Sequence, residues 1–398
     1  MAYFFPSVYM RDGRTISSAI RGDRGAVAPR LAMARERLAV PITVFLLSRC
    51  LLLAVTWIAS HLLPRPAHGN RVLLPVSDPT WSLGKWVGRW FRYDSGWYTS
   101  IAEHGYHYGP LGKASTNFMP LYPLITRAVQ PIAPGSSVWL AAWLVANLAF
   151  LASLAVLWRW ALLRTNRETA LQVLVLVACF PFAFFFASPY AEPLFLALAI
   201  SAFLLAEQGR WPLAIGVAAL STITRPVGMA VVLGLMALAW QRGERRWCAA
   251  AAFACIPLLG FALYLDLDFG HPLAFLTYHS YGWVAPSGGL WHTITDQFHT
   301  KLSPFDRVDA LLAVLFILSG VVAWVRLGAG YGVYVLVGTL LPLVHGLVSM
   351  ERYVIVLFPA MAVWAGWSGK AVRYSIFAVS IFGLVLATAM FVQGYAIF

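Results

Sequence analysis

Charged residues are scarce in this sequence. Only 11% of its 398 residues are Asp, Glu, Lys or Arg, whereas 60% are hydrophobic and the mean hydropathy is +0.72. A soluble domain carries about 25% charged residues, so the deficit excludes that class and indicates an integral membrane protein. The apolar runs are unbroken, as in membrane-spanning helices of about 20 residues. Strands of a transmembrane barrel would instead alternate between apolar and polar residues in shorter segments.

Cysteines and acids are also few. The four cysteines lie in or beside apolar runs at no metal-binding spacing, which argues against both a disulfide framework and a zinc site (Cys50, Cys179, Cys248 and Cys255). The net charge of +13 could indicate nucleic acid binding. However, the basic residues lie between apolar runs, where they set membrane topology. We therefore expect membrane lipids as partners and no nucleic acid.

The apolar runs predict an all-α polytopic bundle of about eleven transmembrane helices. They lie near residues 39–63, 137–158, 169–187, 190–206, 211–224, 226–240, 247–267, 308–326, 331–348, 353–368 and 373–394. With eleven spans, the basic flanking residues fall on one side, which is expected to be cytoplasmic. These residues are Arg35, Arg37, Arg159, Arg164, Arg167, Arg210, Arg242, Arg245, Arg246, Arg326, Lys370 and Arg373.

The same pattern predicts how the chain is divided. Residues 1–38 are polar and Arg-rich, and we expect a disordered cytoplasmic tail; residues 39–398 form a single transmembrane domain. No small-residue cleavage site follows the first apolar run, so it does not resemble a signal peptide. The two long outer segments are 64–136 and 268–307, and the function is expected on that outer face.

Residues 211–240 are either one tilted span or a hairpin of two short arms. Arg225-Pro226 near the middle favours the hairpin. Proline breaks the helical hydrogen-bond ladder, and a lone arginine at mid-membrane is costly. A hairpin instead places Arg225 at the outer surface.

The first outer segment contains an amphipathic stretch before Asp94. Leu83, Trp86, Val87 and Trp90 share one helical face, and Lys85, Arg89 and Arg92 share the other. This pattern predicts an interfacial helix that meets anionic headgroups, or only an anchor in the interface.

Asp94 itself has two compatible interpretations. It is well placed to cap the helix "SGWYTSIAEHG", with Gly105 as the stop. A carboxylate ordinarily ionised at neutral pH can also act as a general base toward a hydroxyl.

Polar and aromatic residues surround these positions. Trp97, Tyr98, Tyr106 and Tyr108 suit either a membrane interface or a sugar face. His104, His107 and Glu103 do not share one helical face, so a metal is possible but not indicated. Further along, Asn117 and Tyr122 in "STNFMPLYP" offer polar groups.

Three charged side chains are expected at the outer ends of later spans. Glu192 is a first-turn acid or a functional group bordering water. Arg225 and Arg352 either bind phosphate oxygens or extend to lipid headgroups. His345 lies near the same span end as Arg352 and Tyr353.

Taken in order, "RYDSGWYTSIAEHGY", "NFMPLYPL", "SPYAEPLF", "TRPVG" and "ERY....FP" resemble the PIG-V-type mannosyltransferases. These belong to the GT-C class of polytopic glycosyltransferases, and the resemblance runs from about residue 81 to residue 360. It implies a GT-C-like fold and a sugar donor carried on a polyprenyl or dolichyl phosphate. It further implies that the acid of the first outer loop, here Asp94, is catalytic. The family's eukaryotic members add mannose to the glycolipid anchor GPI.

The resemblance predicts an inverting mannosyl transfer to an acceptor hydroxyl on a lipid or glycan at the extracytoplasmic face. Asp94 is the predicted general base, and Arg225 and Arg352 are predicted to hold the donor phosphate. The pocket is expected to include Arg92, Tyr93, Trp97, His104, Tyr106, Asn117, Tyr122, Glu192, His345 and Tyr353. No cofactor is expected. The membrane would be the plasma or inner membrane in a prokaryote, or the endoplasmic reticulum in a eukaryote.

Two other functions fit parts of the sequence. A transporter or flippase of lipid-linked sugars would explain a broken helix at 211–240. Against it, the polar residues gather at one face and no repeated halves are evident. A non-catalytic subunit of another membrane enzyme is the third possibility.

Overall fold

The computed structural model of the protein describes residues 24–64, 87–107, 115–276, 304–344, 349–367 and 369–395. These residues form helices joined by short turns, and no strand occurs among them. The all-helical class predicted from the sequence is therefore confirmed.

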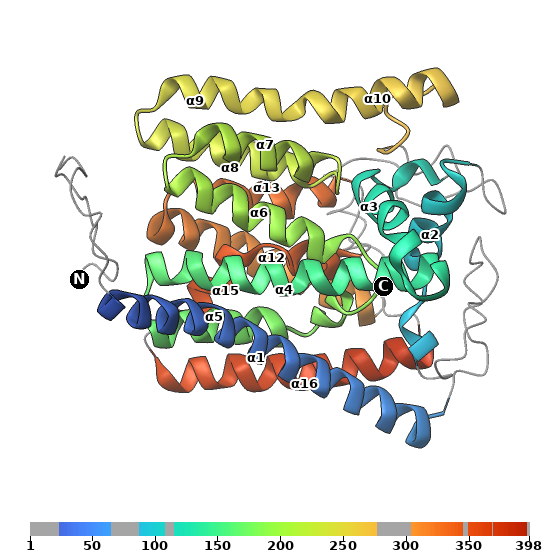
Figure 1. Ribbon diagram of the computed structural model, residues 1–398, viewed down its shortest axis with the longest axis horizontal. Coiled ribbons are helices and arrows are strands. Elements are labelled where there is room, and N and C mark those ends of the chain that lie inside the picture. The colour runs from blue at the N-terminus through green and yellow to red at the C-terminus, as the bar shows by residue number, and fades with distance from the viewer. Residues whose placement is uncertain are drawn as a thin grey trace.

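The α-helices follow one another along the chain and most of them run side by side (Figure 1). They are α1 (Arg24–Leu62), α2 (Asp94–His104), α3 (Leu121–Val129), α4 (Val138–Arg164), α5 (Arg167–Cys179), α6 (Glu192–Glu207), α7 (Trp211–Thr222), α8 (Gly228–Gln241), α9 (Arg245–Ala250), α10 (Ile256–Phe269), α12 (Pro304–Leu327), α13 (Ala329–Leu343), α14 (Met350–Val354), α15 (Phe358–Ala365) and α16 (Lys370–Gln393). Short 3₁₀ turns include η1 (Val87–Trp90), η3 (Ser115–Asn117), η6 (Ala183–Phe186) and η7 (Ala251–Cys255).

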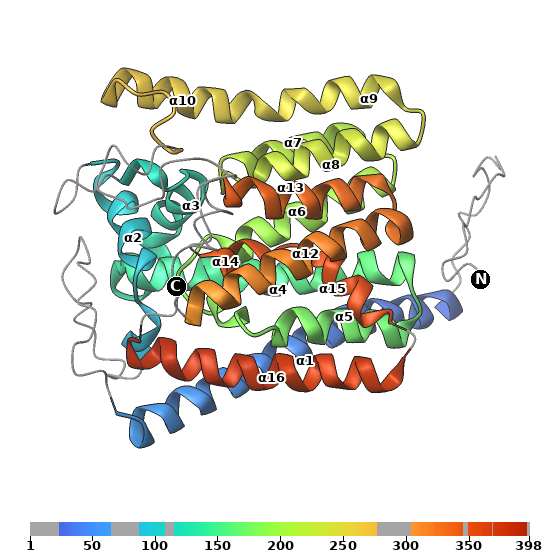
Figure 2. The same ribbon diagram turned by 180° about the vertical axis from the view of Figure 1, so that it is seen from behind.

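Five helical stretches are long and apolar enough to cross a membrane. They are Leu38–Leu62, Val138–Arg164, Arg245–Phe269, Asp306–Leu327 and Lys370–Gln393. Shorter apolar helices, α7, α8 and α13 among them, run beside these five (Figures 1 and 2). The chain is therefore an integral membrane protein, while the number of eleven spans stays a prediction.

Burial is divided between a central helix and outer helices. On α6, large side chains such as Phe195 and Phe203 are fully buried. On α10, by contrast, Leu259, Leu263 and Leu267 are exposed. In water such an apolar surface would be unfavourable, whereas lipid tails accommodate it. The outer helices thus face lipid, and α6 forms the centre of the bundle.

The break predicted within 211–240 is present. Helix α7 ends at Thr222 and α8 begins at Gly228, with Arg225-Pro226 in the turn between them. The two arms pack closely, because a Cβ on Gly228 would lie only 2.4 Å from the carbonyl oxygen of Ser221. Only glycine allows this approach of the two backbones. The hairpin interpretation is confirmed.

Other boundaries differ from the prediction. Helix α1 (Arg24–Leu62) includes residues 24–38, so it extends on the N-terminal side of the predicted first span. Their Ala, Leu, Met and Arg content favours helix. Residues 180–191 are not helical apart from the η6 turn, although we predicted spans over 169–187 and 190–206. Pro181 and Pro189 explain the interruption, since proline cannot donate to the helical ladder.

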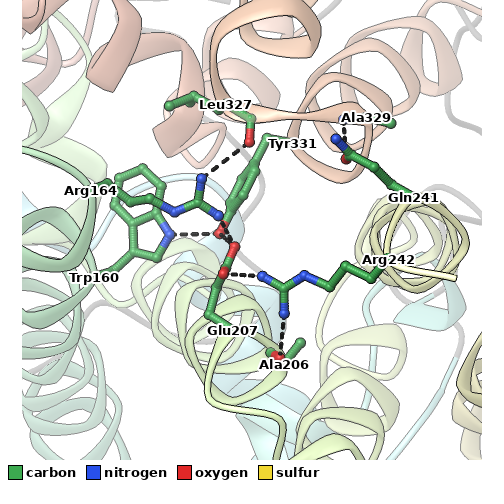
Figure 3. A network of polar contacts seen from close by, with 9 residues as sticks. All are labelled: Trp160, Arg164, Ala206, Glu207, Gln241, Arg242, Leu327, Ala329 and Tyr331. Carbon is green, nitrogen blue, oxygen red and sulfur yellow. Dashed lines mark hydrogen bonds and ion pairs between the residues drawn. The ribbon is translucent and has the colours of Figure 1, made fainter. Parts of the chain in front are cut away.

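At the end of the bundle opposite α2 and α3, a partly buried ionic network ties four helices together (Figure 3). The carboxylate of Glu207 pairs with Arg164 and Arg242. It also accepts a hydrogen bond of 2.9 Å from the hydroxyl of Tyr331, which in turn accepts one of 2.8 Å from the Trp160 indole. Because every charge has a partner, the network fixes α4, α6, α8 and α13 relative to one another.

Candidate active site

Helix α2 runs from Asp94 to His104, and Gly105 follows as its C-cap with a backbone φ of +77°. The predicted stop at Gly105 is confirmed, since a left-handed residue that ends a helix favours glycine. The predicted N-cap is wrong by one residue. Tyr93, with φ +53°, is the cap position, and Asp94 is the first helical residue. A carboxylate there is favoured by the helix dipole, and its oxygens are not used for capping.

Three other charged residues stand at helix ends on the same side of the bundle. Glu192 is the first residue of α6, as one interpretation of the sequence predicted. Arg225 lies in the turn between α7 and α8. Arg352 lies on the short helix α14, which is at the same end of the bundle as α2 and α3 (Figure 2).

These four side chains form one connected ionic cluster. Arg352 pairs through Nη1 with Asp94 Oδ2, and its Nε donates to Glu192 Oε1 over 2.7 Å. Arg225 pairs through Nη1 with the same oxygen of Glu192. The order is therefore Asp94, Arg352, Glu192, Arg225. Two carboxylates balance two guanidinium groups, which makes their burial tolerable.

Exposure separates the members of this ionic cluster. Glu192 is 0% exposed and Arg225 5%, whereas the Asp94 side chain is 16% exposed. Glu192 Oε2 is buried and has no hydrogen-bond partner among the described residues. Glu192 is thus the fixed centre of the cluster. Asp94 is the acid that an incoming molecule can reach.

Aromatic rings enclose the cations. The guanidinium of Arg352 lies 4.9 Å from the centre of the Tyr190 ring, and that of Arg225 lies 5.0 Å from the Tyr353 ring. Cations over aromatic faces are stabilised by the ring quadrupole. Tyr98 on α2 is buried beside the cluster, and burial raises the pKa of its hydroxyl. That hydroxyl therefore stays neutral and is available as a donor.

Several predicted pocket residues line the wall of α2 and α3. Trp97 stacks on Phe118 with ring centres 5.8 Å apart. Tyr122 is fully buried, meets the Tyr98 ring edge-on and donates to the carbonyl of Ala142 over 2.7 Å. The amide nitrogen and oxygen of Asn117 are both buried without a hydrogen-bond partner among the described residues. Unpaired buried amides are uncommon in native proteins, so the side chain of Asn117 has the capacity to hydrogen-bond a polar ligand.

Other predicted pocket residues lie away from the ionic cluster or bond elsewhere. Arg92 Nη2 donates to the carbonyl of Val392 over 2.9 Å, and the Tyr93 hydroxyl to that of Tyr395 over 2.7 Å. Both thus hold the end of α16. His104 is exposed and lies 3.7 Å from Glu103.

Two predictions fall partly or wholly outside the described residues. His345 lies outside them. So do Leu83, Lys85 and Trp86 of the predicted interfacial helix, of which only the η1 turn over 87–90 is described.

An apolar cavity of about 370 Å³ lies between α2, α3 and α10. Its lining includes Ile101, Tyr106, Pro123, Phe261 and Tyr264. The hydroxyl of Tyr106 donates to the Phe118 carbonyl over 2.7 Å, so this residue offers the cavity its ring face. The wall suits an apolar chain better than a sugar.

Sequence reasoning missed Tyr190, and it named Tyr98 among the aromatic residues near Asp94 without placing it in the expected pocket. Tyr190 lies under Arg352, and its hydroxyl donates to the carbonyl of Arg92 over 3.0 Å. Tyr98 packs edge-on against the rings of Phe118 and Tyr122. Both stand in the motifs around Asp94 and Glu192, so their closeness to the two acids was the available signal.

The described parts of the chain contain no cluster of metal-ligating side chains. No three or more His, Cys, Asp or Glu residues gather there in a way that could hold an ion. The ionic cluster pairs each carboxylate with arginine, so arginines supply its positive charge.

One known family matches the part of the chain that contains most of the site. Residues 40–249 match the family model described as Mannosyltransferase (PIG-V). This range is more than half of the chain and contains Asp94, Glu192 and Arg225. No curated protein matches the sequence.

Proposed function

Because the chain belongs to the PIG-V mannosyltransferase family and is a membrane glycosyltransferase, we propose that it moves mannose from a polyprenyl or dolichyl phosphate to an acceptor hydroxyl with Asp94 as general base. Family membership implies a lipid-linked donor and an acceptor. The observation that carries the rest is the ion pair between Asp94 and Arg352. It joins a base for the acceptor to a cation for the leaving group.

The reaction needs a single displacement. The acceptor oxygen attacks the anomeric carbon, the bond from that carbon to the phosphate oxygen breaks, and its electron pair stays on the phosphate. Asp94 takes the proton of the acceptor hydroxyl. A phosphate leaves readily, so no second acid is required, in contrast to glycoside hydrolysis. One displacement inverts the centre, and a β-linked donor gives an α-mannoside.

Charge moves through the ionic cluster in step with this displacement. The leaving phosphate gains one negative charge as Asp94 loses its own on protonation. Arg352 is then released from Asp94 and can neutralise the phosphate. Glu192 holds Arg225 and Arg352 side by side throughout. Such prearranged cations stabilise developing charge without reorganisation.

Groups outside the ionic cluster bind the polyprenyl chain and the sugar. The apolar cavity between α2, α3 and α10 accommodates the first part of the polyprenyl chain. The unpaired amide of Asn117 binds sugar hydroxyls. By the charge pattern of the spans, this end of the bundle is the extracytoplasmic one.

A transfer assay tests this function. The purified protein is incubated with radiolabelled polyprenyl phosphate mannose and a panel of lipid and glycan acceptors. We expect a new mannoside that is sensitive to α-mannosidase. Donor movement across vesicles without any mannoside would instead support the transporter interpretation and contradict the proposal.

A further inference from the structure

Helix α14, which carries Arg352, lacks an ordinary start. It has only five residues, and its cap residue Ser349 has φ +64° and makes no side-chain capping bond. The first N–H groups of a helix need acceptors. The carboxyl of Asp309 of α12, only 5% exposed, lies beside this start and contacts the backbone of Met350 and Glu351.

Glu351 makes a second contact with the same acid. Its side chain is 1% exposed and lies in hydrogen-bonding contact with the carboxyl of Asp309. Two buried carboxyl groups in contact cannot both be ionised at neutral pH, so they share a proton. Burial and the neighbouring Asp309 raise the pKa of Glu351 well above its ordinary value. We place the proton on Glu351, because the charge that remains is then on Asp309 at the helix start, where it is favoured.

Glu351, which contacts Asp309, and Arg352, which belongs to the ionic cluster, are consecutive residues of α14. Glu351 is fixed to α12 through Asp309, while the next residue, Arg352, reaches Asp94 on α2 and Glu192 on α6. The position of the Arg352 guanidinium thus depends on the contact between Glu351 of α14 and Asp309 of α12. A displacement of about 1 Å at a reacting group can cost 100-fold in rate.

We propose that Asp309 and Glu351 are positioning residues, a carboxyl pair sharing one proton that holds Arg352 in register with Asp94. The proposal rests on the proposed function of Arg352. Its signature is that protonated Glu351 acts as a hydrogen-bond donor. A glutamine at that position reproduces the donor, and an alanine does not.

Transfer kinetics test the positioning role. Glu351→Gln is expected to keep kcat within about threefold, whereas Glu351→Ala and Asp309→Ala lower kcat about 10- to 100-fold with a smaller change in KM. In an Arg352→Lys background, Asp309→Ala should cause little further loss, since residues acting through one group are not additive. Exposed Glu103→Gln is the control, and thermal midpoints establish that each variant is folded. Equal loss in Glu351→Gln and Glu351→Ala, or the same factor of loss in both backgrounds, would overturn the proposal.

Infrared spectroscopy tests the shared proton without any substrate. The difference spectrum of wild type minus Glu351→Gln at neutral pH should show the C=O stretch of a protonated carboxyl. Wild type minus Glu103→Gln should show only ionised carboxylate bands. If the first difference lacks the protonated band, the pair is not as proposed even in an active enzyme. A protein that shows the band but transfers no mannose contradicts the proposed function alone.

Discussion

At the scale of single residues, the site depends on Glu192. One of its oxygens is shared by Arg225 and Arg352, and the side chain is completely buried. Without this charge, Asp94 would be the one remaining acid of the ionic cluster beside two buried cations. An uncompensated buried charge is among the most destabilising changes known in proteins.

Glu192→Gln is therefore expected to lower the free energy of unfolding by about 3–5 kcal/mol. The measurement is thermal or denaturant unfolding of the purified protein in detergent. Glu168→Gln, at an exposed position in the first turn of α5, is the matched control and should cost less than about 1 kcal/mol. Equal stability of Glu192→Gln and wild type would mean that Glu192 is not the fixed centre of the ionic cluster.

At the scale of elements, the α7–α8 hairpin places Arg225. The turn is tight because Gly228 approaches the backbone of Ser221 and Thr222. Another glycine, Gly216 in α7, has open space where a Cβ would stand, with no neighbouring atom within 4 Å. Position 228 therefore requires glycine, whereas position 216 of the same hairpin has room for a larger residue.

Gly228→Ala is expected to destabilise the protein by about 1–3 kcal/mol through overpacking and to weaken donor binding by displacing Arg225. Gly216→Ala should be neutral or slightly stabilising, because alanine favours helix over glycine. Unfolding midpoints and binding of polyprenyl phosphate measure the two effects. A Gly228→Ala protein as stable as Gly216→Ala would show that the arms are not in close contact.

Sequence patterns predicted some of these elements and not others. The hairpin was predictable because Arg225 and Pro226 are both unfavourable inside a span. The interruption at 180–191 was predicted only as a short gap between 187 and 190, because the phenylalanines between Pro181 and Pro189 are as apolar as the helices around them. Asp94, Glu192, Arg225 and Arg352 were each recognisable as charges beside apolar runs.

Their pairing was harder to foresee. Asp94 and Arg352 are 258 residues apart, and no local pattern encodes a contact between α2 and α14. For the same reason the hydrogen bonds of Arg92 and Tyr93 to the end of α16 were not predicted.

At the scale of the whole molecule, the two ends of the bundle differ in their charged networks. One end holds the network of Glu207 with Arg164 and Arg242 (Figure 3), and the other holds the ionic cluster of the site. Basic residues of loops concentrate on the cytoplasmic side of membrane proteins. The end that contains Glu207 should therefore face the cytoplasm.

Cysteine labelling in sealed cells tests this orientation. His104 and Arg210 are exposed and lie at opposite ends of the bundle. In a variant whose four native cysteines are replaced, His104→Cys should react with a membrane-impermeant maleimide in intact cells. Arg210→Cys should react only after permeabilisation. The reverse pattern would place the site on the cytoplasmic face.

The most direct measurement of the central claim is the turnover of Asp94→Asn with labelled polyprenyl phosphate mannose under saturating donor. General-base catalysis typically contributes about 10²–10⁴-fold, so we expect a loss in that range while donor binding changes little. The unfolding midpoint should fall less than in Glu192→Gln, because Asp94 is partly exposed and Glu192 still pairs with both arginines. Glu103→Gln, an acid on the same helix, should retain full turnover. Turnover of Asp94→Asn close to that of wild type would contradict the assignment of Asp94 as the base.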